Sequence, residues 1–385
     1  MTFCDPAEQE AITGHDISAL NLPEGVPPLR SFYLYLSSSC NLRCRHCWIT
    51  PEYSKSGPSP GKTIIIEDLY KAVIEAKELG LSQAKLTGGE PMLHPNFREI
   101  VDMLTNEGIS MNMETNGTLM TYETACYLKE HSKVNFISVS LDSPVPEEHD
   151  AFRGVKGAFD ATVNGLRAMV SAGYTNCQVI MSVHRGNILQ VKDLVNLAKE
   201  LGAASVKFNP VTHSGRGITM HERGEALGFR EYLDFSRYVN EELRPSAHIS
   251  VIMPVPLSLT PLNELWRTKG KCGDCGVIGI LGVLGGGEIA LCGIGETIPE
   301  LVYGHLGIDS IRDIWLNNQV LNELRRDIED PASYPGVCGS CIHARACRTG
   351  CVANNYTYCG RLVSPGWLCD EAYRRGLFPA SRLRG

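Results

Sequence analysis

The first half of the chain alternates between two kinds of hydrophobic pattern. Short runs rich in apolar, β-branched and aromatic residues are followed by longer segments in which apolar residues recur at helical spacing. The first pattern predicts strands, and the second predicts amphipathic helices. We expect strands at 32–38, 83–86, 109–113, 136–141, 178–183 and 205–209, and helices at 65–79, 96–106, 122–130, 159–172 and 189–201.

Regular alternation of strand and helix indicates parallel βαβ units and therefore an α/β fold. The alternating region is too short for a complete eight-stranded barrel, which typically needs about 250 residues. An open barrel of six units, a partial (β/α)6 TIM-like barrel, fits the length better. Catalytic groups in such folds lie beyond the carboxyl ends of the strands, so the residues that follow each predicted strand are the first place to look for chemistry.

The pattern changes after about residue 245, where glycine and cysteine become frequent and helical periodicity persists only at 311–315 and 320–328. Residues 279–292 predict a hairpin with a glycine turn. A segment this rich in loops needs something to fold around, and metal clusters would supply it. We expect a lead-in at 1–30, a core at 31–245, a bridging segment at 246–310 and a C-terminal region at 311–385.

Charge and composition exclude several classes of protein. The net charge of −7 argues against a large nucleic-acid interface. No apolar stretch approaches the roughly 20 residues of a membrane helix, and the N-terminus lacks the features of a signal peptide. A cytoplasmic location is therefore expected. There the 15 cysteines favour metal or redox chemistry over disulfides.

Three of these cysteines directly follow the first predicted strand. Cys40, Cys44 and Cys47 have the spacing C-x3-C-x2-C. Cysteine thiolates converging from a loop are typical ligands of an iron–sulfur cluster, and three ligands leave one iron open for reaction. The alternative is a zinc knuckle completed by His46, which would have to fold back between two ligating cysteines.

This spacing resembles the signature of the radical S-adenosylmethionine (SAM) superfamily. The resemblance implies that the open iron of a [4Fe–4S] cluster chelates SAM, with His46 near the adenine. Gly88, Gly89, Glu90 and Pro91 resemble the family's GGEP segment, which binds the SAM amino group; glycines admit a close ligand, and Glu90 can meet an ammonium.

Further contacts are implied at the next strand ends. The resemblance assigns a place in the SAM site to Asn116 and to Asp142, a ribose or carboxylate contact to Ser140, and a pairing with the SAM carboxylate to Arg153. Each motif alone can be an ordinary turn, but their order along the chain is specific.

The later cysteines resemble the SPASM extension of this superfamily. The resemblance implies two auxiliary [4Fe–4S] clusters, and so three clusters in all. The one nearer the active site would take Cys272, Cys275, Cys292 and Cys351, and the distal one Cys338, Cys341, Cys347 and Cys369. Zinc or disulfides are the alternatives for these cysteines, and Cys359 is an alternative to Cys369. Fully ligated clusters suit electron transfer, which would make the net reaction an oxidation. Outside the clusters, Cys126 and Cys177 read as small core residues, whereas Cys4 has no assigned role.

Relatives with this extension mostly modify peptides or proteins. The resemblance, closest to maturases of the SynChlorMet peptide cassette, therefore implies a SAM-dependent oxidation, such as a cross-link, in a ribosomally made peptide. Gly293 follows Cys292 where sulfatase-maturing enzymes carry an aspartate, so formylglycine formation is disfavoured. The short lead-in implies a separate leader-binding (PqqD-like) protein, and flavodoxin or ferredoxin is the expected electron donor. Oxidation of a small molecule or a tetrapyrrole precursor is the alternative.

The pattern identifies no catalytic acid or base. Four residues outside the motifs could line a cavity, although packing or surface roles are more usual for such residues: His213, Arg216, Glu296 and Tyr303.

Overall fold

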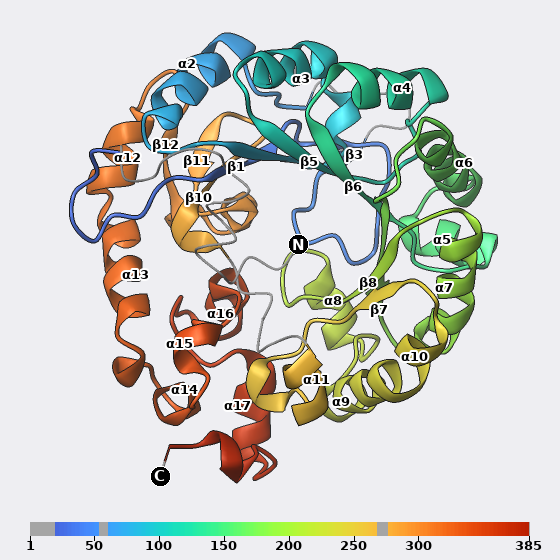
Figure 1. Ribbon diagram of the computed structural model, residues 1–385, viewed down its shortest axis with the longest axis vertical. Coiled ribbons are helices and arrows are strands. Elements are labelled where there is room, and N and C mark those ends of the chain that lie inside the picture. The colour runs from blue at the N-terminus through green and yellow to red at the C-terminus, as the bar shows by residue number, and fades with distance from the viewer. Residues whose placement is uncertain (1–19, 54–60, 268–275, 385) are drawn as a thin grey trace.

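A computed structural model describes residues 20–53, 61–267 and 276–384. Within these ranges ten strands form one sheet in the order β12-β11-β10-β1-β4-β5-β6-β7-β8-β9. Figure 1 shows the strands inside an outer arc of helices. The strands are β1 (Ser31–Tyr35), β4 (Gln83–Thr87), β5 (Ser110–Thr115), β6 (Val134–Ser140), β7 (Gln178–Val183), β8 (Ser205–Pro210), β9 (Ser250–Ile252), β10 (Ile280–Val283), β11 (Glu288–Ala290) and β12 (Val302–His305).

The six predicted strands are all present, and each is hydrogen-bonded in parallel to the next one along the chain. The α/β fold is therefore confirmed. β1 ends at Tyr35 rather than at residue 38, because the chain turns there into the cysteine loop. That loop forms a second, small sheet from β2 (Ser39–Cys40) and β3 (Glu52–Tyr53).

The sheet continues past the boundary expected near residue 245. β9 adds to β8 in parallel, and β10 adds to β1 in parallel at the other side. β10 and β11 form the expected hairpin, but its attachment to β1 was not predicted. All four residues of β10 are buried, so no alternation marks which strand it pairs with. The main sheet therefore includes residues that the sequence pattern assigned to a bridging segment.

The five predicted helices are also present: α2 (Ile66–Lys77), α3 (Phe97–Asn106), α4 (Tyr122–His131), α6 (Ala158–Ser171) and α7 (Val191–Glu200). α5 (Pro146–Arg153) was not predicted, although Pro146 in its first turn, Glu147 and Glu148 beside it, and a left-handed Gly154 at its end are ordinary helix boundary signals. α8 (Gly217–Glu222), α9 (Phe229–Tyr238), α10 (Arg244–Ser246) and α11 (Leu262–Arg267) follow β8 or β9.

The C-terminal region is more helical than its pattern suggested. Its helices are α12 (Ile311–Asn317), α13 (Gln319–Glu329), α14 (Val337–Ser340), α15 (Ala344–Cys347), α16 (Val352–Cys359) and α17 (Trp367–Arg374). Most are too short to show apolar periodicity. In Figure 1, α12 and α13 continue the ring of helices next to α2, whereas α17 lies near α9. Among the described residues, no helix is long and apolar enough to cross a bilayer.

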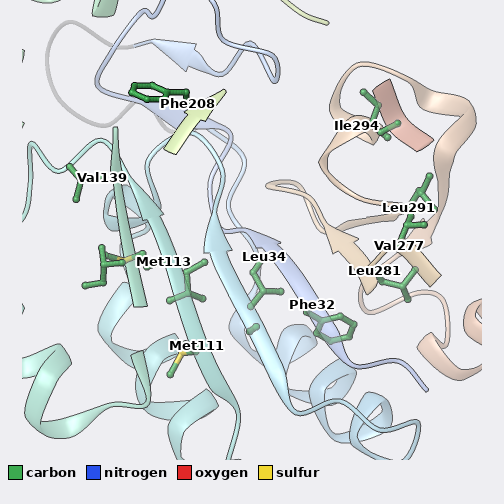
Figure 2. Packing of buried hydrophobic residues seen from close by; sticks show 14 of the residues in the cluster. Phe32, Leu34, Met111, Met113, Val139, Phe208, Val277, Leu281, Leu291 and Ile294 are labelled. Atoms are coloured by element: carbon green, nitrogen blue, oxygen red, sulfur yellow. The ribbon is translucent and has the colours of Figure 1, made fainter. Parts of the chain in front are cut away.

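A single large hydrophobic core joins the two parts of the chain. Phe32 and Leu34 of β1, Met113 of β5 and Leu281 of β10 are fully buried in it, and Figure 2 shows these side chains. Trp315 of α12 belongs to the same core, and its Nε1 donates a hydrogen bond to the backbone oxygen of Pro27 at 2.8 Å. The C-terminal region is thus packed directly onto the sheet.

Candidate active site and metal centres

The Cys40–Cys47 loop lies beyond the carboxyl end of β1, as the fold predicts for reactive groups. Cys40 and Cys44 are buried, and Cys47 is partly exposed. N–H groups point at two of the sulfurs: the backbone of Leu42 donates to Cys40 Sγ at 3.4 Å, and Arg153 Nη1 lies 3.5 Å from Cys44 Sγ. Hydrogen bonds of this kind to sulfur are a recognised feature of iron–sulfur sites.

The predicted GGEP segment holds the first part of this loop through its backbone. The amides of Gly89 and Glu90 donate to the carbonyl oxygens of Ser37 and Ser39, both at 3.0 Å. A β-carbon at Gly89 would lie 1.9 Å from Ser39 O, so no other residue fits here without moving the loop. Gly88 is also constrained, with a φ of 121° that favours glycine. One role of the two glycines is therefore to let β4 approach the cysteine loop.

Replacing Gly89 with Ala should displace the cysteine loop, because the added methyl overlaps Ser39 O. We expect a loss of about 1–3 kcal/mol in the free energy of unfolding, the usual cost of overpacking, together with reduced iron incorporation after reconstitution. Denaturant titration and iron analysis measure the two effects. Gly279→Ala is the matched control, because a β-carbon there meets nothing closer than 3.5 Å. Equal behaviour of the two variants would contradict this role of Gly89.

The end of α5 holds the second part of the loop. The amides of Arg43 and Arg45 donate to the carbonyl oxygens of Arg153 and Phe152 at 2.9 and 3.0 Å. The Arg153 side chain also reaches Asp142, with Nε 2.6 Å from Oδ2, and both side chains are almost completely buried. Arg153 therefore connects the end of β6, where Asp142 lies, to the Cys44 thiol.

The Asp142–Arg153 pair is charged despite its burial. Burial alone would raise the pKa of Asp142, but the Arg153 guanidinium and the amide of Ser182 hold this pKa below its ordinary value. Burial likewise opposes the charge on Arg153, and Asp142 raises the pKa of Arg153 above normal. Each charge thus favours the other in a buried setting.

Glu90 is fully buried and connects the ends of β4 and β5. Its carboxylate accepts hydrogen bonds from Thr115 Oγ1 and the Asn116 amide, both at 2.8 Å, and from the Met92 amide at 3.3 Å. Burial raises the pKa of Glu90 to about 7, although these hydrogen bonds oppose the shift. Its carboxylate is therefore engaged within the protein. Pro91, next in the segment, is also buried.

Asn116 extends this network to the cysteine loop. Its Nδ2 donates to Asn41 Oδ1 at 2.8 Å and lies 3.9 Å from Cys40 Sγ, while its Oδ1 accepts from the Thr118 amide at 2.9 Å. Ser140 is the last residue of β6 and is half-buried. Asn116, Ser140 and Asp142 thus lie at the carboxyl ends of strands, His46 lies on the cysteine loop, and Arg153 lies at the end of α5 that holds this loop.

His46 lies in a stack of three rings. It is parallel to Phe152, with centroids 4.6 Å apart, and Phe152 stacks on His184 at 4.5 Å. Burial, more than the nearby Arg216, lowers the pKa of His46 to about 3, so its imidazole is neutral. A neutral ring in an aromatic stack is compatible with an adenine neighbour.

Of the four residues that the sequence suggested could line a cavity, Arg216 lies next to the cysteine loop. Its amide donates to Cys47 O at 2.9 Å, and its guanidinium is close enough to His46 to lower that pKa. Among the described residues, Arg216 Nε and Nη2 have no hydrogen-bond partner although they are buried. Its sequence signal was weak, since a single arginine seven residues after a predicted strand is unremarkable by itself.

The other three candidates have the following neighbours. His213 stacks on His221 with ring centroids 3.4 Å apart, Glu296 Oε1 is 3.5 Å from the Gly285 amide, and Tyr303 is near Cys292.

The donor set around the triad fits an iron–sulfur cluster. Burial raises the pKa of Cys40 and of Cys44, so both are protonated thiols until a metal displaces the protons. The amide and guanidinium hydrogens directed at the sulfurs then have an anionic thiolate to bind. In the part of the chain that the structure describes, no three His, Cys, Asp or Glu side chains are placed to hold a single metal ion.

Four C-terminal cysteines gather in a second place. One small cavity is lined by Cys338, Cys341, Cys347 and Cys369, beside Ser258 and Phe378. Ser258 Oγ lies 3.3 Å from Cys369 Sγ, and the His343 amide donates to Cys341 Sγ at 3.4 Å. Cys359, the alternative to Cys369, is exposed and donates to Ser364 Oγ at 3.0 Å.

The remaining predicted ligands are partly described. Cys292 is near Cys351, which raises the pKa of Cys292 further after the larger effect of burial. Cys272, Cys275 and Cys4 lie outside the described residues. Cys177 is fully buried in the core, as expected, and Cys126 is partly buried.

The structure also explains Gly293. A β-carbon at this position would lie 2.0 Å from the hydroxyl of Tyr35, the last residue of β1. An aspartate therefore cannot follow Cys292 while Tyr35 keeps its place.

These features define a class of protein: an α/β enzyme with three cysteines, two of them buried, on a loop at the carboxyl ends of a parallel sheet. Residues 34–198 match the Radical SAM superfamily. The chain is 30% identical to the AdoMet-dependent heme synthase of Oleidesulfovibrio alaskensis, over 96% of this chain and 95% of that protein. The chain therefore belongs to the radical SAM superfamily. Its cofactors are SAM and at least one [4Fe–4S] cluster.

Other relatives have names that refer to peptide products. The chain is 32% identical to the subtilosin biosynthesis protein AlbA of Bacillus subtilis, over 60% of this chain and 50% of that protein. It is 27% identical to the mycofactocin maturase MftC of Mycobacterium tuberculosis, over 83% and 78%. The fold resembles Streptococcus suis SuiB bound to S-adenosylmethionine, with a TM-score of 0.65 at 15% identity over 94% of this chain and 81% of SuiB.

Proposed function

We propose that this protein reductively cleaves SAM and uses the resulting radical to oxidise a ribosomally made peptide, with a cross-link as the expected product. The observation that carries the proposal is the cysteine loop, which the ends of β4, β5 and α5 hold through backbone and side-chain hydrogen bonds. When bound, the cluster supplies the electron that cleaves SAM to methionine and a 5′-deoxyadenosyl radical. The protein's own residues position the reactants and exclude water.

In this proposal Cys40, Cys44 and Cys47 hold the catalytic cluster. The contacts proposed for SAM are His46, the Gly88–Pro91 segment, Asn116, Ser140, Asp142 and Arg153. Support comes from their common location above the strand ends. Arg153 is already paired with Asp142 and directed at Cys44. We therefore add Arg216, the buried guanidinium beside His46 with unpartnered nitrogens, as a further group for the SAM carboxylate.

Arg216→Gln should weaken SAM binding by about tenfold or more, because a charge-assisted hydrogen bond contributes roughly 1.5–3 kcal/mol. Arg216→Lys should restore part of the affinity, since it keeps the charge but not the two-pronged geometry. Equilibrium binding of SAM to the anaerobic holoenzyme measures both. Arg223→Gln, an exposed change about two turns of helix further on, should leave SAM affinity unchanged. Unaltered affinity in Arg216→Gln would remove Arg216 from the SAM site.

Two auxiliary clusters of a SPASM-type extension belong to the same proposal. The shared cavity of Cys338, Cys341, Cys347 and Cys369 supports the distal cluster. The nearness of Cys292 and Cys351 supports the other, which Cys272 and Cys275 would complete. The hydrogen bond from Cys359 to Ser364 favours Cys369 as the last ligand. Full ligation suits these clusters to accept the electron that the oxidised substrate releases.

The peptide assignment draws on the names of AlbA and MftC. It carries with it a separate leader-binding (PqqD-like) protein, a flavodoxin or ferredoxin as electron donor, and a cytoplasmic location. We also propose that the lead-in, core, bridging and C-terminal regions differ in function. The boundary at 245 is not a boundary of the fold, because β9 to β12 lie beyond it and belong to the same sheet.

A tetrapyrrole precursor is the second candidate substrate. It is favoured by the coverage of the AdoMet-dependent heme synthase, which exceeds that of the peptide maturases cited here. The two candidates share the chemistry of the cysteine loop and differ in what occupies the space above it.

Anaerobic reconstitution followed by SAM turnover tests the proposed function. Three clusters predict about 12 iron atoms per chain and one cluster predicts about 4. Peptides encoded beside the gene, with and without a leader-binding protein, and reduced tetrapyrrole precursors are then compared as substrates by mass spectrometry. A peptide product with fewer hydrogens supports the proposal. A modified tetrapyrrole and unchanged peptides would transfer it to the second candidate.

A further inference from the structure

A cavity of about 390 Å³ lies at the amino ends of the strands, opposite to the end that carries the cysteine loop. It is lined by residues that come before two parallel strands: Val26 and Pro27 before β1, and Ile278 before β10. The cysteine loop comes after β1. Because β1 has five residues at roughly 3.3 Å per residue, the cavity and Cys40 are separated by about 16 Å of strand. The cavity is therefore distinct from the SAM site.

Positive charge dominates the lining of this cavity. Arg325 of α13, Arg345 of α15 and Arg348 contribute three guanidinium groups, against one carboxylate from Glu329. None of the ion pairs formed among the described residues includes any of these three arginines. The charge of Arg348 also adds to the effect of burial in lowering the pKa of Arg30. The cavity thus has a local excess of cations in a chain whose net charge is −7.

Arg325 is the most deeply placed of the three, with 5% of its surface exposed. Its Nη1 donates to Trp315 O at 2.7 Å and to Asn322 Oδ1 at 2.8 Å, and its guanidinium carbon is 4.3 Å from the centre of the Trp315 ring. These contacts fix the group in one orientation. Its Nη2 is buried and has no partner among the described residues. A fixed donor without an acceptor is costly unless a ligand supplies the acceptor.

The rest of the lining is apolar. Val26, Pro27, Ile278, Ile328 and Pro331 face the same space as the arginines. Its volume lies within the range of roughly 300–1,000 Å³ that is typical of small-ligand sites. Guanidinium groups match the planar geometry of a carboxylate, and the apolar wall suits a hydrocarbon body.

We propose that this cavity binds a carboxylate carried on an apolar body. The inference goes beyond the proposed function and does not depend on it, since no residue of the cysteine loop or the SAM contacts takes part. Two sources share this chemistry: a free organic acid, and an acidic side chain flanked by apolar residues in a peptide. Because the cavity lies far from the SAM site, the part of the ligand that binds here is held in place and does not react.

Isothermal titration of the full-length, anaerobically purified protein tests the proposal. Hexanoate should bind at one site, and hexanamide, which has the same apolar body without the charge, should bind at least tenfold more weakly. Acetyl-Leu-Glu-Leu-amide and its Gln counterpart distinguish the peptide source from the free acid. Saturating SAM should displace neither ligand.

Two variants locate the site. Arg345→Gln removes an exposed guanidinium, and Arg348→Asn removes another while suiting the left-handed backbone at this position, where φ is 48°. Each should weaken binding of the preferred acid by about tenfold. Arg326→Gln is the control, because Arg326 is exposed on the same helix as Arg325 but does not line the cavity.

Several results would overturn the proposal: no binding of either acid, equal binding of acid and amide, displacement by SAM, or unchanged affinity in both cavity variants. Arg345 and Arg348 flank Cys347, so iron content is measured for each variant. If Arg348→Asn alone loses iron, Arg345→Gln decides the question. Failure of this test leaves SAM cleavage and peptide oxidation untouched, because neither is its readout.

Discussion

Replacing Cys40, Cys44 and Cys47 together with Ala should abolish SAM cleavage and remove about four iron atoms per chain. Three thiols are the proposed anchor of the catalytic cluster, and the open iron that binds SAM is lost with it. The loop should keep its path, because the amides of Gly89, Glu90, Arg43 and Arg45 hold it by backbone hydrogen bonds that the change does not touch. Iron analysis and the yield of 5′-deoxyadenosine under reduction measure the two losses.

Matched cysteine changes make this result specific. Cys359→Ala removes an exposed thiol that does not line the cavity of the proposed distal cluster, and this variant should retain both iron and SAM cleavage. Cys369→Ala should lose auxiliary iron but keep the signal of the catalytic cluster. The assignment of the triad would be wrong if the triple variant still formed 5′-deoxyadenosine. Protein that contained zinc and no iron would overturn the cluster interpretation as a whole.

The strands and helices of the core were predictable because each carries its own signal. Alternating runs such as 178–183 give the strand directly, and β7 occupies those same residues. The order of the sheet then follows from parallel connections between successive strands. What could not be predicted was pairing between distant segments, such as β10 with β1, because a strand buried on both faces has no alternation to indicate its neighbours.

The candidate site, like the fold, was only partly predictable from the sequence. Spacing alone located the cysteine loop, since ligand geometry restricts how far apart the thiols can be. The surroundings of the loop were less predictable. The sequence predicts SAM contacts for Glu90 and Arg153, but it does not display the hydrogen bonds of Glu90 with Thr115 and Asn116, or the ion pair of Arg153 with Asp142. Side-chain pairing between β4 and β5, or between β6 and α5, is decided by packing that a single sequence does not display.

The buried pair of Asp142 and Arg153 has consequences for stability that follow from its burial. Taking two charges out of water is costly, and their attraction repays that cost only while both are present. Arg153 also directs Nη1 at Cys44 Sγ. The pair is therefore a structural support of the cysteine loop in addition to any contact it makes with SAM.

Arg153→Met should destabilise the protein by about 3–5 kcal/mol, because it leaves the Asp142 carboxylate buried without its partner. Adding Asp142→Asn, which keeps an oxygen to accept the Ser182 amide, should recover part of this loss. Denaturant unfolding of the anaerobic apoprotein measures both free energies. Arg185→Met provides the control: it breaks the ion pair with Glu231, in which both side chains are about half exposed, and should cost about 0–1 kcal/mol. Since the Asp142–Arg153 pair differs from that surface pair chiefly in burial, equal costs for the two arginine variants would show that water reaches Asp142. A double variant less stable than Arg153→Met would show that the charge on Asp142 stabilises the fold through groups other than Arg153.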